Sequence, residues 1–347
     1  MKRQANIELL RGVLMFMIVM VHLTGNGVLD ANNPIDYNHP NWLIANVIDA
    51  ICYPAVNCFI LVSGYFGLNL SIRKFLKLEI PVLIYGIILL FIIGPLSVKG
   101  FSNAFFPFLS KSYWFLTSYF ILLLISPLIN TYLSSLNKTQ VHQVLLIAIG
   151  IIVLVPSFTP FRLSDSRGMD FVNFSVLYMV GRYVSSYGVN ISLKKSSLIY
   201  IISSLMSLTF TVVFAYYWGI NKGWKSVFYS YTHIFVYIQA IGLLFIFKHI
   251  NIPPKVGDFV TKISPSFFFI YVIHESPFVH DRLYNWIQSE AFYYSDLFWI
   301  HTLGYALLIF LTCILIDIVF RRFIFSKFIE KIICYFDYKC GRLLQKV

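Results

Sequence analysis

Charged residues are scarce in this sequence. Asp, Glu, Lys and Arg together make up 12% of the 347 residues, whereas hydrophobic residues make up 58%. A soluble domain carries about 25% charged residues, so this composition does not fit a single soluble core. Apolar runs of about 20 residues, the length that crosses a bilayer as a helix, recur along the whole chain. The composition therefore indicates an integral membrane protein without a separate soluble domain.

Several functional signatures are missing as well. The sequence has no Walker-type phosphate loop, no zinc signature and no Gly-Xaa-Ser-Xaa-Gly elbow. ATP-driven transport, metalloprotease and serine-hydrolase chemistry therefore have no motif behind them. The five cysteines follow neither a disulfide framework nor metal-ligand spacing. We expect no metal ion and no tightly bound cofactor.

The apolar runs predict an all-α fold, a polytopic transmembrane helical bundle of about ten spans. Helices are favoured because lipid offers the backbone no hydrogen-bond partners, and these runs lack the alternation of barrel strands. The predicted spans are residues 7–25, 43–66, 78–95, 113–134, 140–157, 171–187, 197–218, 228–247, 264–281 and 299–320. Residues 1–322 are thus expected to form one transmembrane domain.

Basic residues predict the orientation, because cytoplasmic loops retain Lys and Arg. With ten spans the two termini share a side. Eighteen of the 27 Lys and Arg residues fall on that side, seven fall on the other, and Arg11 and Arg182 lie within spans. Both termini are therefore predicted to be cytoplasmic, with the protein in the cell membrane. The net charge of +12 fits this topology and contact with anionic membrane lipids, so no nucleic-acid partner is expected.

The last segment, residues 323–347, mixes apolar side chains with lysines. We predict that it forms a cytoplasmic, basic amphipathic helix at the membrane surface rather than a further span. The residues that suggest this are Phe325, Phe328, Ile329, Ile332 and Phe336, with Lys327, Lys331 and Lys339 among them.

The first span carries three polar residues that are costly in hydrocarbon and are therefore candidate functional residues. Arg11 and His22 are 11 residues apart, about three helical turns, so both project from one face roughly 16 Å apart. Glu8 lies one turn before Arg11 and can partly neutralise it. The plainer alternative is that Arg11 reaches the inner headgroups and His22 hydrogen-bonds near the outer interface.

The second span ends in Ser63 and Gly64 and is followed by the basic residues Arg73, Lys74 and Lys77. Small residues permit close helix approach or entry of a thin ligand, and a basic cluster can bind phosphates. Taken alone, these features fit helix packing followed by an ordinary cytoplasmic loop.

The ninth predicted span places Tyr271 and His274 one turn apart, with Glu275 next to the histidine. Tyr271 and His274 can face the same cavity. Arg182 and Asp317 fall near the inner ends of their spans, where ion pairing or snorkelling is the default interpretation.

Together these segments resemble the membrane acyltransferase-3 family, which includes bacterial O-acetyltransferases of cell-envelope polysaccharides. The family pattern of a basic residue, ten residues and a histidine is similar to Arg11 through His22. Four further segments are similar to family segments: Phe59–Phe66, Arg73 through Pro81, Tyr113–Leu116 with Pro127, and Ser266–His274. Two residues depart from the family pattern: Ile60 stands at an aromatic position, and Lys77 stands where arginine is common. Only the membrane domain of the family is expected, because the sequence ends soon after the last span.

The resemblance implies a cytoplasmic acyl-CoA donor, acetyl-CoA by family frequency, and a carbohydrate acceptor on the far face, in capsule, exopolysaccharide, a lipid-linked intermediate or wall glycan. Arg73, Lys74 and Lys77 would hold the nucleotide phosphates, with Arg11 or Arg182 as further contacts. The pantetheine arm would enter beside Ser63 and Gly64.

On the same resemblance, His22 would act as general base on the sugar hydroxyl or accept the acyl group as nucleophile. Tyr271 or His274 would donate to the oxyanion or align the sugar, and Trp114 would stack on it. Two alternatives of other classes stay open: an exporter of polysaccharide or lipid-linked sugar, and a binding module without turnover.

The predicted orientation can be tested by cysteine labelling. Cysteines placed at Asn33 and Ser192 should react with a membrane-impermeant thiol reagent from opposite faces of intact and inverted vesicles. Labelling of both positions from the same face would contradict the topology and the assignment of the donor side.

Overall fold

The structure is a computed structural model that describes residues 4–25, 38–109, 113–159, 161, 163–164, 166–218, 228–321, 331 and 334–335. The predicted tail at 323–347 lies almost entirely outside the described residues. Residues 26–37, which include Asn33 and most of the first predicted external loop, also lie outside them.

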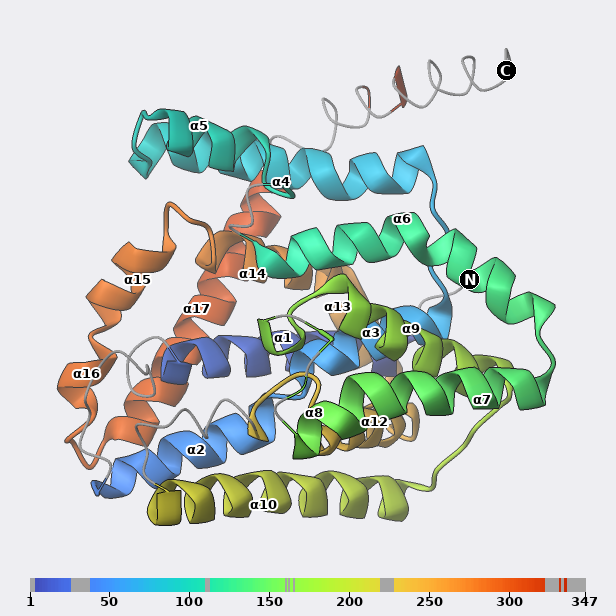
Figure 1. The fold of residues 1–347 in the computed structure, drawn as a ribbon. Helices are drawn as coiled ribbons and strands as arrows, with labels where there is room; N and C mark the ends of the chain where they lie inside the picture. The colour runs from blue at the N-terminus through green and yellow to red at the C-terminus, as the bar shows by residue number, and fades with distance from the viewer. Residues whose placement is uncertain are drawn as a thin grey trace.

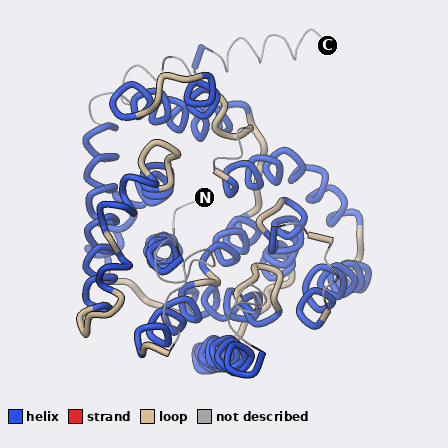
Figure 2. Tube along the Cα trace, turned by 60° about the vertical axis from the view of Figure 1, so that its left-hand side comes forward, coloured by secondary structure: helices blue, strands red, loops and turns tan. Residues whose placement is uncertain are grey.

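Every regular element among the described residues is a helix, so the predicted all-α class is confirmed (Figure 2). The longer helices are α1 (Ala5–Leu23), α2 (Pro40–Cys52), α3 (Ala55–Phe66), α4 (Ile72–Ile93), α6 (Trp114–Ser135), α7 (Lys138–Ile149), α9 (Phe171–Ser186), α10 (Leu193–Trp218), α12 (Ile234–Lys248), α13 (Pro254–Ile263) and α17 (Phe298–Phe320). The shorter ones are α5 (Val98–Phe105), α8 (Val155–Phe158), α14 (Phe267–His274), α15 (His280–Ile287) and α16 (Ser289–Phe292).

Within the part of the chain that the structure describes, eight helical segments are long and apolar enough to cross a membrane. They are Ala5–Leu23, Pro40–Phe66, Ile72–Ile93, Trp114–Ser135, Lys138–Phe158, Leu193–Tyr217, Pro254–His274 and Phe298–Phe320. The other two predicted spans are helical but shorter: α9 has 16 residues and α12 has 15. The helix α9 begins at the predicted residue 171, where Asp170 accepts from the backbone N–H groups of Val172 and Asn173. The helix α12 begins six residues later than predicted, where His233 accepts from the backbone N–H of Phe235.

The ninth predicted span, 264–281, is displaced in the structure. The segment begins ten residues earlier, at Pro254, includes a 3₁₀ turn at Ser264–Ser266, and ends at His274. Pro254 suits the first turn of a helix because its missing N–H has no intrahelical partner there. Glu275 therefore follows the end of a span, at its junction with the loop that leads to α15.

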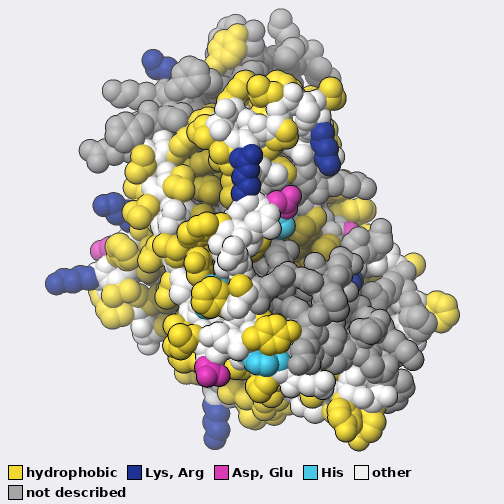
Figure 3. All heavy atoms as spheres, turned by 90° about the vertical axis from the view of Figure 1, so that its left-hand side faces the viewer, with side chains coloured by type: hydrophobic (Ala, Val, Ile, Leu, Met, Phe, Trp, Pro, Cys, Tyr) yellow, Lys and Arg dark blue, Asp and Glu magenta, His cyan; other side chains and the backbone are white. Residues whose placement is uncertain are grey.

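The helix α1 lies in the middle of the bundle (Figure 1) and packs against α2, α3, α12, α13, α14 and α17. Its Leu10 and Leu14 are fully buried. The outer helices α4, α6 and α17 instead expose large apolar side chains such as Phe91, Leu128 and Leu315. Exposed apolar side chains along the outer helices suit contact with lipid. Figure 3 looks at the α15–α16 end of the bundle, where hydrophobic side chains lie among charged, histidine and other polar ones.

Two glycines allow α3 and α9 to pack closely. A Cβ atom on Gly64 would overlap the carbonyl oxygen of Tyr178, and one on Gly181 would overlap the carbonyl oxygen of Leu61. Small residues let backbones approach in this way inside a membrane, where van der Waals packing replaces the hydrophobic effect between helices. Gly64, which was expected beside the pantetheine arm, thus lies in a helix contact.

This contact predicts the effect of adding one methyl group. Gly181→Ala should destabilise the protein by about 1–3 kcal/mol, because the new Cβ forces α3 and α9 apart. Gly304→Ala on α17 is the matched control, since a Cβ there meets no atom within 4 Å. The melting temperatures of the purified variants in detergent measure the difference, and equal melting temperatures would contradict the close packing.

Candidate functional site

A cavity of about 260 Å³ lies between α1, α3, α4, α6 and the α13–α14 segment. Arg11 and His22 both line it, so the predicted shared face of the first span is confirmed. Ser63, Trp114 and Tyr271, three further predicted site residues, line the same cavity. Most of the remaining lining side chains are apolar: Met15, Ile18, Val56, Phe59, Leu78, Phe115, Pro265, Phe267 and Phe268, beside Tyr119 and Ser264. The cavity is therefore an apolar passage with a guanidinium and an imidazole about 16 Å apart along α1.

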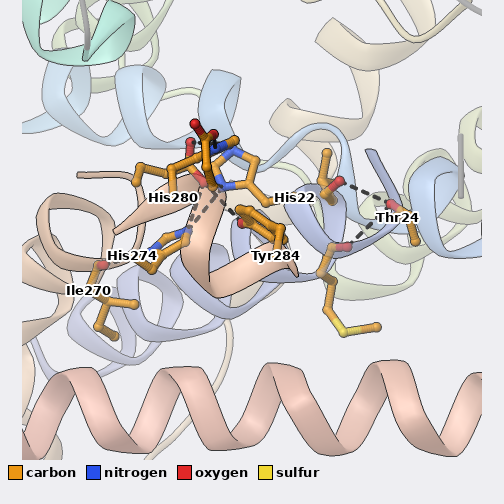
Figure 4. Close-up of polar contacts among 10 residues, drawn as sticks. His22, Thr24, Ile270, His274, His280 and Tyr284 are labelled. Atoms are coloured by element: carbon orange, nitrogen blue, oxygen red, sulfur yellow. Dashed lines mark hydrogen bonds and ion pairs between the residues drawn. The ribbon is translucent and has the colours of Figure 1, made fainter. Parts of the chain in front are cut away.

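The imidazole of His22 is held at the end of α1 by residues from the end of α14 (Figure 4). Its Nδ1 lies 3.0 Å from Nε2 of His274 and 3.0 Å from Oε1 of Glu275. His274 is completely buried, and its Nδ1 lies 2.6 Å from the carbonyl oxygen of Ile270. His22 and Glu275 are each 18% exposed, so both are partly accessible while His274 sits behind them. The structure thus joins His22 and His274, which are 252 residues apart in sequence.

Residues of α15 hold the carboxylate of Glu275. The hydroxyl of the buried Tyr284 donates to its Oε1 at 3.0 Å, and Nε2 of His280 lies 3.9 Å from its Oε2. Burial alone would raise the pKa of the Glu275 carboxyl, but His22, His274 and His280 and the hydrogen bond from His22 lower that pKa below its ordinary value. Glu275 is therefore an ionised carboxylate at neutral pH.

Arg11 lies at the other end of the cavity. Its Nη1 is 2.9 Å from Oε1 of Glu8, one turn earlier on α1, as the spacing predicted. The Glu8 side chain is 7% exposed and that of Arg11 is 36% exposed, so the pair has a buried acid and an accessible guanidinium. Arg11 is the only Lys or Arg among the described residues that line the cavity.

The predicted phosphate-binding residues Arg73, Lys74 and Lys77 are exposed on the first two turns of α4, and none of them lines the cavity. Leu78 does line it and follows Lys74 by one helical turn. Because residues four apart share a helix face, Lys74 lies on the same side of α4 as Leu78.

Arg182 lines a second cavity, of about 210 Å³, together with Asn130, Tyr183 and Tyr187. Its guanidinium lies beside Gly67, where a Cβ would stand 2.8 Å from Nη1. Arg11 lies 6.0 Å from the ring of the preceding residue, Phe66. The two arginines therefore flank neighbouring residues at the end of α3.

Trp114 and Tyr271 are packed by other aromatic rings. Trp114 stacks on Tyr231 with ring centroids 5.5 Å apart, and Tyr271 contacts Phe115 with centroids 5.7 Å apart. These contacts fix the two rings as part of the cavity wall.

Three residues of this region were not assigned a role from the sequence. Glu275 was noted only as an acid beside His274, and Tyr284 and His280 were not noted. The signal that could have found them is the run from His274 to Tyr284, which holds two histidines, two acids and a tyrosine within 11 residues. His22, His274 and Glu275 are also close enough for their ligand atoms to hold a metal ion.

Comparison with protein families matches an acyltransferase domain, of the acyltransferase 3 type, to residues 4–326. The match includes all the residues of both cavities. Comparisons with curated proteins and with solved structures found no match.

Proposed function

The chain belongs to the acyltransferase-3 family, and we propose that it transfers an acetyl group from cytoplasmic acetyl-CoA to a hydroxyl group of a carbohydrate on the far side of the membrane. The observation that carries this proposal is the cavity that joins Arg11 to His22. It offers a cation for a phosphate, an apolar passage for a thin chain and a base for a hydroxyl proton, in that order along α1.

The dimensions of the cavity support an extended donor. Arg11 and His22 stand about 16 Å apart along the helix, which suits a phosphate group bound at one end and a thioester at the end of a pantetheine arm at the other. The apolar lining fits the arm, and Ser63 provides a hydroxyl part-way along. Arg73 and Lys74, exposed on the first turn of α4, would attract and bind the remaining phosphates of CoA.

The proposed reaction uses His22 as general base. The imidazole removes the proton from the sugar hydroxyl while the hydroxyl oxygen attacks the thioester carbonyl carbon. The carbon–sulfur bond then breaks, and the protonated imidazole returns a proton to the departing thiolate of CoA. Trp114 offers a ring face on which the sugar can stack, and the hydroxyl of Tyr271 can align the acceptor or donate to the oxyanion.

Release of CoA separates this proposal from the exporter alternative. The purified protein should release CoA from acetyl-CoA faster when a glycan acceptor is added. Glycan movement across a membrane without CoA release would favour export instead.

The role of His22 predicts a large loss of activity on substitution. His22→Ala and His22→Gln should both lower the rate of acyl transfer by at least about 100-fold, because neither side chain takes up a proton at neutral pH. Binding of CoA, measured by calorimetry in detergent, should be retained. His301→Gln is the control, since it replaces a histidine within a span that does not line the cavity. Activity near that of the unchanged protein in His22→Gln would assign the base to another residue, with His274 next.

The donor site predicts a selective change in affinity. Replacing Arg73 and Lys74 together by alanine should raise the apparent KM for acetyl-CoA about tenfold or more, because charge-assisted hydrogen bonds are each worth about 1.5–3 kcal/mol. The KM for the acceptor should change little. Lys194 and Lys195, an exposed basic pair at the start of α10, provide the matched double-alanine control. An unchanged donor KM would assign the phosphates to Arg11 or Arg182.

A further inference from the structure

The contacts of His22 determine which of its ring nitrogens carries the proton. A backbone carbonyl oxygen only accepts, so Nδ1 of His274, 2.6 Å from the carbonyl of Ile270, must carry the proton of that ring. In neutral His274 the other nitrogen, Nε2, then has a free lone pair. This lone pair faces Nδ1 of His22 at 3.0 Å.

The carboxylate of Glu275 leads to the same assignment. Its Oε1 lies 3.0 Å from the same Nδ1 of His22, and an ionised carboxylate only accepts. Nδ1 of His22 therefore faces two acceptors and satisfies them only when it carries the proton. In neutral His22 the unprotonated nitrogen is then Nε2, the atom available to take a proton from a substrate.

The carboxylate is itself fixed in place. Tyr284 donates its hydroxyl to the oxygen that faces His22, and Tyr284 is 9% exposed in the packing of α15. His280 flanks the second oxygen. Because α15 holds the Glu275 carboxylate, the position of that carboxylate does not depend only on the loop that follows α14. A carboxylate held in this way can set the orientation of the His22 imidazole.

We propose that Glu275, held by Tyr284, is the positioning residue of this site: it fixes His22 as the tautomer protonated on Nδ1 and stabilises the imidazolium that forms when Nε2 takes the acceptor proton. This inference rests on the proposed acyl transfer by His22. In the reaction, Glu275 exchanges no proton. Its carboxylate faces the positive charge that the His22 imidazole gains. The imidazole loses that charge again when it protonates the thiolate of CoA.

The same three side chains have one other chemical use. The separations of their ligand atoms are 3.0, 3.0 and 3.7 Å, which a divalent metal with bonds of about 2.0–2.2 Å can bridge. A metal would require Nδ1 of His22 to be unprotonated, opposite to the assignment above. The two arrangements therefore predict different tautomers and different responses to chelators.

The test compares Glu275→Gln with Asp281→Asn. Both changes remove one acidic charge near His280, but Asp281 is 89% exposed and does not contact His22. Glu275→Gln should lower kcat about 100-fold with both KM values within about twofold. Asp281→Asn should keep the rate and both KM values of the unchanged protein.

Tyr284→Phe provides a second, milder variant. It leaves the carboxylate in place but removes the hydroxyl that holds it, so kcat should fall less than in Glu275→Gln, by about tenfold, again without a change in KM. A fall in activity that only follows a loss of thermal stability, with kcat and KM changing together, would show a structural role and overturn the proposal.

The tautomer can be measured without turnover. In protein labelled with ¹⁵N-histidine, the NMR signals of His22 should show a protonated Nδ1 and an unprotonated Nε2. The opposite tautomer would overturn the proposal, as would activity that a chelator removes and zinc restores. Full activity of Glu275→Gln beside inactive His22→Gln would refute the positioning role alone. Absence of CoA release by the unchanged protein would instead refute the proposed function, and the NMR result would still decide the geometry.

Discussion

Ionisable side chains inside an apolar bundle are costly unless they have partners, and this constraint shapes the centre of the protein. Glu8 neutralises Arg11 on α1. Asp317 on α17 pairs with Arg321 and accepts from Tyr85 on α4. At the opposite end of α1 from Glu8, Glu275 meets His22. Two of these contacts, Tyr85 with Asp317 and His22 with Glu275, also join helical segments that are far apart in sequence.

The buried helix α1 also sets the geometry of the proposed reaction. A straight helix fixes the distance between Arg11 and His22 independently of loop movements, and the packing of six other helices around α1 keeps that helix in place. The α13–α14 segment supplies Tyr271 to the cavity and His274 behind His22. Arg11 and His22, the proposed donor and catalytic ends of the cavity, therefore stand on one rigid helix, and a second segment brings Tyr271 and His274 to them.

Much of the fold followed from hydrophobic length alone. Eight predicted spans correspond to long apolar helices, because an apolar run of that length has one stable backbone arrangement in lipid. One difference arises where a polar cap acts. His233 caps α12 six residues after the predicted start, where its side chain accepts from a first-turn backbone N–H group. The ninth span ends at His274, so Glu275 lies outside it and not within the predicted range 264–281. The hydrophobicity of a stretch of sequence does not show the residue at which a helix ends.

The sequence by itself determined the class of fold, the shared face of Arg11 and His22 and the pairing of Glu8 with Arg11, because these depend only on apolar length and on the 3.6-residue period of one helix. The tertiary structure decided that His274 lies behind His22, that Glu275 holds its Nδ1 and that Gly64 serves helix packing. Such contacts join helices far apart in sequence, and only the packing of whole helices determines which faces meet.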